Sequence, residues 1–251
     1  MSDVSDWWRT SIIDMEPGRI ALRGRPVEEM IGRMGFAETV WLMVRGEAPS
    51  PAEAALLEAT LVAAVDHGPQ APSIAAARMA VTCGLPVNAA MATGVNMLGD
   101  VHGGAGAQAL ELYLAIDESG DLSGTVEAWR RENGKHVPGF GHRFHPVDPR
   151  APRLMALIRE AAEAGHVTDR FALIAEGVEA HISQGRARIP MNIDGATAAV
   201  HAALGFSPDA SRGLFCLSRS VGLLAHALEQ KQQGGRNKGP TPPRHRWTYE
   251  G

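Results

Sequence analysis

The chain has 251 residues, of which 45% are hydrophobic and 21% charged. These proportions are typical of a globular protein, and they exclude a disordered chain, a collagen-like chain and a disulfide scaffold. Its 24 basic and 28 acidic side chains leave a net charge of −4, so no general attraction to nucleic acid or to an anionic membrane is expected. At about 150 residues per domain, the length predicts one large domain or two closely joined ones.

The start of the chain and its two cysteines indicate a cytoplasmic protein. The N-terminus, MSDVSDWWRTS, lacks the basic start and the apolar stretch of a signal peptide. No uncharged apolar run reaches the roughly 18 residues of a membrane span. Cys83 and Cys216 stand in apolar runs without metal-type spacing, which predicts two buried, reduced thiols.

Residues 11–24 form the first patterned segment, and the only one that favours strands. Two short apolar arms flank Glu16, Pro17 and Gly18, which predicts a hairpin. Beyond it, apolar residues recur at helical spacing, and aromatic residues make up only 5% of the chain. The helices predicted in the first half cover residues 36–46, 51–68, 73–84, 86–100 and 105–117. Several contain mostly small or apolar residues, so we expect them inside a layered bundle or at a subunit interface.

The second half begins with more amphipathic helices, whose charged faces mark a candidate smaller domain. These helices are predicted at residues 122–133, 148–165 and 169–184. Apolar helices return at 194–206 and 211–231, which implies that the chain re-enters the first core. The tail that follows is rich in Gly, Pro and Arg and has no helical period, but Trp247 and Tyr249 give it apolar anchors.

Two polar residues at helix ends allow both a structural and a catalytic interpretation. His102 is followed by Gly103 and Gly104, which permit a tight turn and the close approach of a ligand. A lone histidine near a helix end is more often a cap or a packed core residue. Asp194 directly precedes an Ala-rich apolar helix, where the spacing alone favours an N-cap.

Cationic residues supply a second set of candidates. The stretch PGFGHRFHPVDPR, residues 138–150, reads either as a cationic loop for a polyanionic ligand or as an ordinary connector. Arg219 lies inside an otherwise apolar helix, where a guanidinium requires either a buried ion pair or a bound carboxylate. His226, at helical spacing from Arg219, is interpreted as a buried packing or supporting group.

Together, these segments resemble the citrate synthase superfamily, and within it the short citryl-CoA lyase branch that also forms the C-terminal module of ATP-citrate lyase. The resemblance covers nearly the whole chain. It rests on seven blocks in order: RTSIIDMEPGRIALRGRPVEEM with VWLMVRGEAPS, VDHGPQAPS, GDVHGGAGAQAL, PGFGHRFHPVDPR, NIDGATAAVHAALGF, LSRSVGLLAHALEQK and RHRWTYEG.

The resemblance implies three catalytic residues. His102 matches the histidine that holds the acyl-CoA thioester oxygen, and His142 matches the one on the oxaloacetate carbonyl or citryl hydroxyl. Asp194 matches the carboxylate that moves a proton to or from the acetyl methyl. An enolate needs a neutral donor at its oxygen and a base at its carbon, and these residue types supply both.

The resemblance also implies residues that bind the substrates. Arg150, Arg219 and Arg244 match arginines that bind substrate carboxylates, with Arg244 contributed by the neighbouring subunit, and His67 matches a further substrate-binding histidine. Planar guanidinium groups recognise carboxylates through paired hydrogen bonds. For the CoA phosphates, Lys135 and Arg143 are the nearest candidates, because Phe144, His145 and Pro146 stand where many relatives carry a basic residue.

The fold implied is all-α and citrate synthase-like, with the active site in a cleft between two domains. A discontinuous large domain would comprise residues 1–103 and 194–251, and a small domain residues 104–193. Only one helix separates Pro49 from Asp66, where full-length citrate synthases carry a long helical block. Gly195 also replaces the aromatic residue that synthases commonly place after the catalytic aspartate. Both features favour the lyase branch.

The function predicted is reversible cleavage of citryl-CoA to acetyl-CoA and oxaloacetate, by a homodimer or larger assembly without a metal or redox cofactor. One alternative is a citrate or 2-methylcitrate synthase, which also hydrolyses the thioester. Another is a metal-dependent lyase or hydrolase that uses His102, His142 and Asp194 as a two-histidine, one-carboxylate site. A third is an inactive CoA-binding partner subunit.

Overall fold

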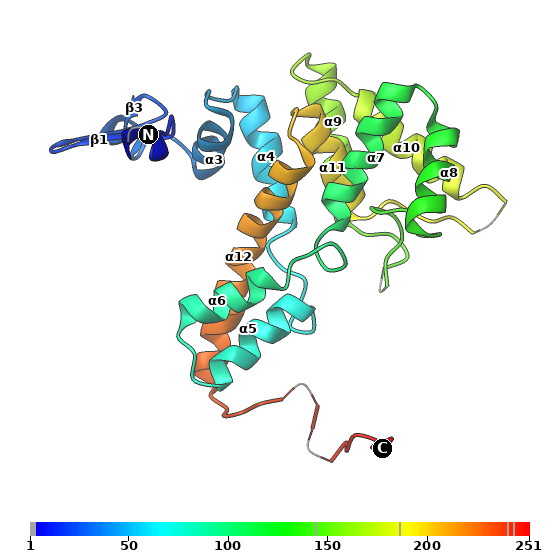
Figure 1. The fold of residues 1–251 in the computed structure, drawn as a ribbon. Coiled ribbons are helices and arrows are strands. Elements are labelled where there is room, and N and C mark those ends of the chain that lie inside the picture. Colours follow the sequence, from blue (N-terminus) through cyan, green and yellow to red (C-terminus); the bar gives the residue numbers. More distant parts are fainter. Residues whose placement is uncertain (1–3, 144, 186, 240, 243) are drawn as a thin grey trace.

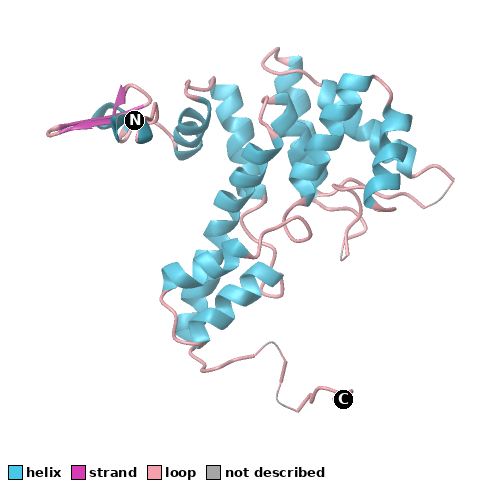
Figure 2. Cartoon of the chain, in the orientation of Figure 1, coloured by secondary structure: helices cyan, strands magenta, loops and turns pink. Residues whose placement is uncertain are grey.

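The computed structural model describes residues 4–143, 145–185, 187–239, 241–242 and 244–251. The helices are α1 (Val4–Trp7), α2 (Val27–Met30), α3 (Phe36–Arg45), α4 (Pro51–Ala63), α5 (Pro72–Thr82), α6 (Val87–Asn96), α7 (Ala105–Ser119), α8 (Leu122–Asn133), α9 (Arg150–Glu163), α10 (Arg170–Ile182), α11 (Ile193–Ala203) and α12 (Pro208–Gln233). Within the described residues, strands occur only in the N-terminal hairpin (Figure 2). The predicted all-α fold class is therefore confirmed.

The N-terminal hairpin lies at one end of the molecule, beyond α3 (Figure 1). Strands β1 (Ile13–Glu16) and β2 (Arg19–Leu22) pair antiparallel around a turn in which Gly18 has a φ of 79°. A short third strand, β3 (Arg25–Pro26), pairs with β2 and was not predicted. The hairpin itself is confirmed.

Helix α4 shows how local sequence sets the start of a helix near the site. The Ser50 side chain accepts a hydrogen bond from the Glu53 backbone N–H, and the Glu53 carboxylate accepts one from the Ser50 N–H, which forms a capping box ahead of Pro51. The helix ends at Ala63, five residues before the end of the predicted helix 51–68. Residues 64–68 form a loop instead, which changes the setting of His67.

The main hydrophobic core joins α3 and α4 to α7–α11 and to the first part of α12. Its most deeply buried large side chains include Trp41, Leu57, Tyr113 and Ile158. Two smaller clusters join α5 and α6 to the later part of α12, through residues such as Ile74, Leu223 and Ala227. Helix α12 has 26 residues and is long enough to contribute to the main core and to the two smaller clusters (Figure 1).

The return of the last apolar helix to the first-half helices is visible in the packing of α12 against α5, α6 and α7. Helix α11 packs against α7, α9 and α10. The division into domains 1–103 with 194–251 and 104–193 stays a prediction.

The prediction of two buried thiols is wrong. Cys83 is exposed and Cys216 is half-buried. Cys83 follows the last residue of α5 and lies in the short connection to α6, outside the packed face of the helix. No helix in the described part of the chain combines the length and the apolar character needed to cross a bilayer.

Candidate active site

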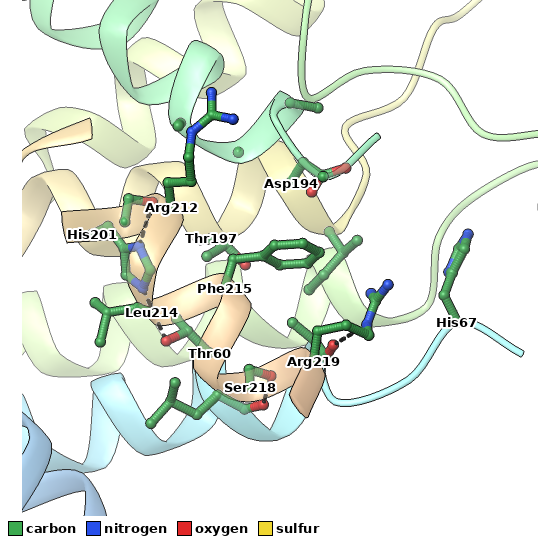
Figure 3. A pocket seen from close by; sticks show the side chains of 18 of the residues that line it. Thr60, His67, Asp194, Thr197, His201, Arg212, Leu214, Phe215, Ser218 and Arg219 are labelled. Atoms are coloured by element: carbon green, nitrogen blue, oxygen red, sulfur yellow. Dashed lines mark hydrogen bonds between the residues drawn. The ribbon is translucent and has the colours of Figure 1, made fainter. Parts of the chain in front are cut away.

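A cavity of about 140 Å³ lies where α4, α11, α12 and the loop before α7 meet (Figure 3). Five of the seven residues predicted for catalysis and substrate carboxylates line it: His67, His102, Arg150, Asp194 and Arg219. In Figure 3, Asp194 projects from α11, while Phe215 and Arg219 project from α12. Residues far apart in the sequence thus share one cavity.

His102 is held by a residue that the sequence analysis missed. The backbone N–H of Ser73, in the first turn of α5, donates to His102 Nε2 over 3.2 Å, and the Ser73 hydroxyl lies 3.0 Å from the same nitrogen. A backbone N–H can only donate, so Nε2 is the acceptor and the neutral ring carries its proton on Nδ1. Burial first, and then the charge of Arg219, lowers the pKa of His102. The site therefore contains a neutral imidazole with a donor at Nδ1.

The two glycines after His102 are required by close backbone packing. A Cβ on Gly104 would lie 2.5 Å from the carbonyl oxygen of Asp100, and one on Gly103 would lie 2.8 Å from the Phe215 ring. Gly103 also has a φ of 94°, which L side chains rarely adopt. These contacts form the tight turn that presents His102 to the cavity.

Asp194 does not cap its helix. The N-cap of α11 is Asn192, whose side-chain oxygen accepts hydrogen bonds from the N–H groups of Asp194 (2.9 Å) and Gly195 (3.3 Å). Among the described residues, the Asp194 carboxylate has no hydrogen-bond partner. Burial raises the pKa of Asp194, and the nearby Arg150 and Arg219 oppose this shift only in part. A carboxyl group of raised pKa is well suited to exchange a proton with a carbon acid.

Arg150 is oriented by Asp148, a second residue that the sequence analysis missed. Nε and NH2 of Arg150 donate to the two Asp148 carboxylate oxygens, each over 2.9 Å, and Asp148 is fully buried. Burial opposes ionisation, but the hydrogen bonds and charge of Arg150 lower the pKa of Asp148 to about 2. The same carboxylate accepts the Ile193 N–H over 3.0 Å. Asp148 therefore ties Arg150 to the start of the helix that carries Asp194.

Arg219 is buried, with 5% of its surface exposed. Its Nε donates to the carbonyl oxygen of Ala64 over 3.2 Å, and its guanidinium carbon lies 4.8 Å from the centre of the Phe215 ring. No carboxylate forms an ion pair with Arg219 in the described part of the chain. The sequence analysis predicted either a buried ion pair or a bound carboxylate for Arg219, and this geometry favours the bound carboxylate.

His142, the third predicted catalytic residue, does not line the cavity itself, but its ring centre lies 5.9 Å from that of His67, which does. His142 Nδ1 accepts the His145 backbone N–H over 3.1 Å, so the proton of the neutral ring is on Nε2. Burial is the largest cause that lowers the pKa of both His67 and His142. The positive charge of Arg150 adds to this lowering for both rings, which favours their neutral forms.

The loop that carries His142 is joined directly to the start of α11. Gly141 N–H donates to the Pro190 carbonyl over 2.8 Å, and the Asn192 side-chain amide donates to the Gly141 carbonyl over 2.7 Å. A Cβ on Gly195 would lie 2.5 Å from the carbonyl oxygen of Gly139. The glycine after Asp194 is thus needed for the close contact that places His142 relative to Asp194.

Three predicted binding residues do not line this cavity: Lys135, Arg143 and Arg244. All three are exposed. Their assignments stay predictions. The part of the chain that the structure describes also contains no group of three or more His, Cys, Asp or Glu side chains arranged to hold a metal ion.

His201, a buried histidine in the cavity wall, is expected to lower the stability of the folded protein in acid. His201 Nε2 lies 3.1 Å from the Thr60 hydroxyl and Nδ1 lies 2.8 Å from the Ser211 hydroxyl, and burial lowers the pKa of His201 to about 4. Below pH 6.5 the unfolded chain binds a proton that the folded chain excludes. This residue should therefore remove about 2 kcal/mol from the free energy of unfolding between pH 7 and pH 5.

Urea unfolding at the two pH values tests this prediction in the wild type and in His201→Gln, whose side chain is polar but does not titrate. The stability difference between pH 7 and pH 5 should be smaller in the variant. Equal differences in the two proteins would contradict the assignment.

Comparison with known proteins identifies the family and the fold of the chain. Residues 43–239 match the family model described as citrate synthase, C-terminal domain. The solved structure of citryl-CoA lyase from Hydrogenobacter thermophilus is 30% identical, with a TM-score of 0.87 over 97% of this chain and 94% of that one. ATP citrate lyase from Methanothrix soehngenii, 21% identical, shares the fold with a TM-score of 0.83 over 100% of this chain and 45% of that one.

A citrate synthase from Haloferax volcanii is 29% identical over 232 residues, or 91% of this chain. The match covers 59% of that relative's length, so the chain is considerably shorter than the synthase it resembles.

Proposed function

The chain belongs to the citrate synthase family, and we propose that it is a citryl-CoA lyase, which cleaves citryl-CoA reversibly to acetyl-CoA and oxaloacetate. The observation that carries the proposal is the shared cavity, in which a neutral histidine, a carboxyl group of raised pKa and two arginines lie together. The similarity to a citryl-CoA lyase over nearly the full length of both chains supports the lyase reaction.

In the cleavage direction, three groups would divide the chemistry. His142 takes the proton of the tertiary hydroxyl on Nδ1, which must first release the His145 backbone N–H, as the carbon–carbon bond breaks and oxaloacetate leaves as the ketone. The electron pair of that bond becomes the enolate of acetyl-CoA, whose oxygen is stabilised by the Nδ1–H of His102. Protonated Asp194 then delivers its proton to the enolate carbon. No water is consumed, and no metal or redox cofactor is required.

The arginines would bind the substrate carboxylates. Arg219 supplies a desolvated guanidinium that forms no ion pair with any described residue, and Arg150 is aligned by its two hydrogen bonds to Asp148. His67 would add a neutral donor from the loop after α4. Lys135 and Arg143 are proposed to contact CoA phosphates nearer the surface.

The protein is proposed to act as a homodimer, in which Arg244 reaches the cavity of the neighbouring subunit. Helix α12 and its surroundings carry exposed apolar side chains, among them Met97, Val221, Leu224 and Leu228. Such side chains on a helix that also lines the site are typical of a subunit interface. The exposed tail, with Trp247 and Tyr249, would be anchored on the partner.

The alternative function is citrate or 2-methylcitrate synthesis, and it is favoured by the sequence similarity to a curated citrate synthase. The two reactions differ in what happens at the thioester. A synthase must admit water to hydrolyse citryl-CoA, whereas a lyase must exclude water so that acetyl-CoA leaves intact. The amount of free CoA thiol released therefore distinguishes a synthase from a lyase.

We expect purified protein to convert citryl-CoA to oxaloacetate with little free CoA thiol. Oxaloacetate is measured by coupled reduction, and thiol by a thiol-reactive dye in the same sample. Acetyl-CoA plus oxaloacetate should release thiol only slowly. Rapid, stoichiometric thiol release from that pair would establish a synthase instead, and an absence of turnover with either substrate would reject both reactions.

A further inference from the structure

One face of α12 holds the loop 64–68 at three successive points. Arg219 Nε donates to the Ala64 carbonyl, and Gly222 lies against the Val65 carbonyl, where the space would not accommodate a Cβ. One turn further along, His226 Nε2 lies 3.1 Å from Asp66 Oδ1. These contacts follow the loop residue by residue up to His67.

The hydrogen bonds around His226 have a defined direction. Arg78 NH1, on α5, lies 3.0 Å from His226 Nδ1, and a guanidinium can only donate. Nδ1 is therefore the acceptor, and the ring proton is on Nε2, from which it is donated to Asp66 Oδ1. Arg78 is itself fixed by Glu229 (2.5 Å) and by the exposed Gln233 (2.7 Å).

Asp66 connects these hydrogen bonds to the backbone around His67. Its other carboxylate oxygen, Oδ2, accepts the Gly68 backbone N–H over 3.1 Å. The resulting turn encloses His67, and Gly68 adopts a φ of 81° at its end. The orientation of His67 toward the cavity thus depends on a carboxylate held from both sides.

We propose that His226 and Arg78 are positioning residues that act through Asp66 to hold His67 in its substrate-binding orientation. This inference rests on the proposed function, in which His67 contacts oxaloacetate. The packing of α12 against α5 and α6 is supplied by other side chains, such as Leu223 and Ala227. The side chains of Arg78 and His226 are 14% and 16% exposed, so they lie at the edge of this packing, where a hydrogen-bonding role is separable from core packing.

The test compares His226→Leu with His226→Gln in titrations with oxaloacetate and, separately, with CoA. His226→Leu should weaken oxaloacetate binding about tenfold, equivalent to about 1.4 kcal/mol, and leave CoA binding within twofold of wild type. His226→Gln should stay within threefold for both ligands, because its amide nitrogen can donate to Asp66 from the place of Nε2. Gln232→Ala, a change at an exposed glutamine of α12 that takes no part in these hydrogen bonds, is the matched surface control and should bind both ligands as wild type does.

A double-mutant cycle tests whether His226 affects oxaloacetate binding through His67. In a His67→Ala background, His226→Leu should weaken oxaloacetate binding by no more than a further twofold. Asp66→Ala should have the same effect as His226→Leu. Because the Asp66 side chain is partly exposed, this variant keeps the test available if His226→Leu fails to fold.

Three results would overturn the inference: unchanged oxaloacetate affinity in both His226→Leu and Asp66→Ala, equal weakening of both ligands, or independent effects of His67 and His226. A wild-type protein that binds CoA but not oxaloacetate would instead reject the proposed function itself.

Discussion

Asp194→Asn is expected to reduce citryl-CoA cleavage by a factor on the order of 10²–10⁴, the usual range for loss of a general acid or base. The asparagine amide has nearly the same shape as the carboxyl group, but it cannot donate a proton to the enolate carbon or take one back. Stability should change little, because the cap of α11 is formed by Asn192 and not by Asp194. Turnover and thermal unfolding, measured on the same preparation, check both statements.

Asp209→Asn is a matched control for this variant. Asp209 occupies the same second helical position in α12 that Asp194 occupies in α11, behind a side-chain N-cap from Ser207, but it is exposed and does not line the cavity. It should retain full activity. Asp194→Asn activity within threefold of wild type, about 0.7 kcal/mol in the barrier, would remove Asp194 from the mechanism.

Arg244→Ala is expected to lower turnover by a factor on the order of 10–100, because one charge-assisted contact to a substrate carboxylate is lost. Within its own chain, Arg244 is exposed and does not line the cavity, so its contribution would come from the neighbouring subunit. Removal of residues 240–251 should have at least the same effect while the helical core stays folded. Arg246→Ala, a nearby exposed arginine of the tail, should have a much smaller effect and serves as the control.

Mixed subunits separate a contribution in trans from one in cis. After exchange, half of the dimers formed from equal amounts of Arg244→Ala and Asp194→Asn subunits contain one of each. One of the two sites in such a hybrid has both native residues, so turnover should recover to about a quarter of wild type. Activity that stays at the level of the separate variants, although subunit exchange is demonstrated, would place Arg244 in the site of its own chain.

The helical fold follows from local pattern. Apolar residues at helical spacing predicted the helices of both halves, and the turn residues Pro17 and Gly18 predicted the hairpin, because these preferences act between residues close in sequence. Family resemblance added the candidate residues, five of which line one cavity. The predicted helix 51–68 extends beyond Ala63, where α4 ends. The residues that follow are held in a loop by contacts to α12, and local pattern contains no information on those contacts.

The chemical state of the site, by contrast, depends on partners distant in sequence. The proton of His102 is placed by Ser73, 29 residues away, and Asp148 accepts the N–H of Ile193, 45 residues further along. His226, interpreted from sequence as a packing or supporting group, meets Arg78 across 148 residues. Which nitrogen carries a proton, and whether a carboxyl group has a raised or lowered pKa, is set by burial and by the donors that folding brings within about 3 Å. The sequence by itself therefore determined the helices and the candidate residues, and only the tertiary structure decided how those residues are protonated and oriented.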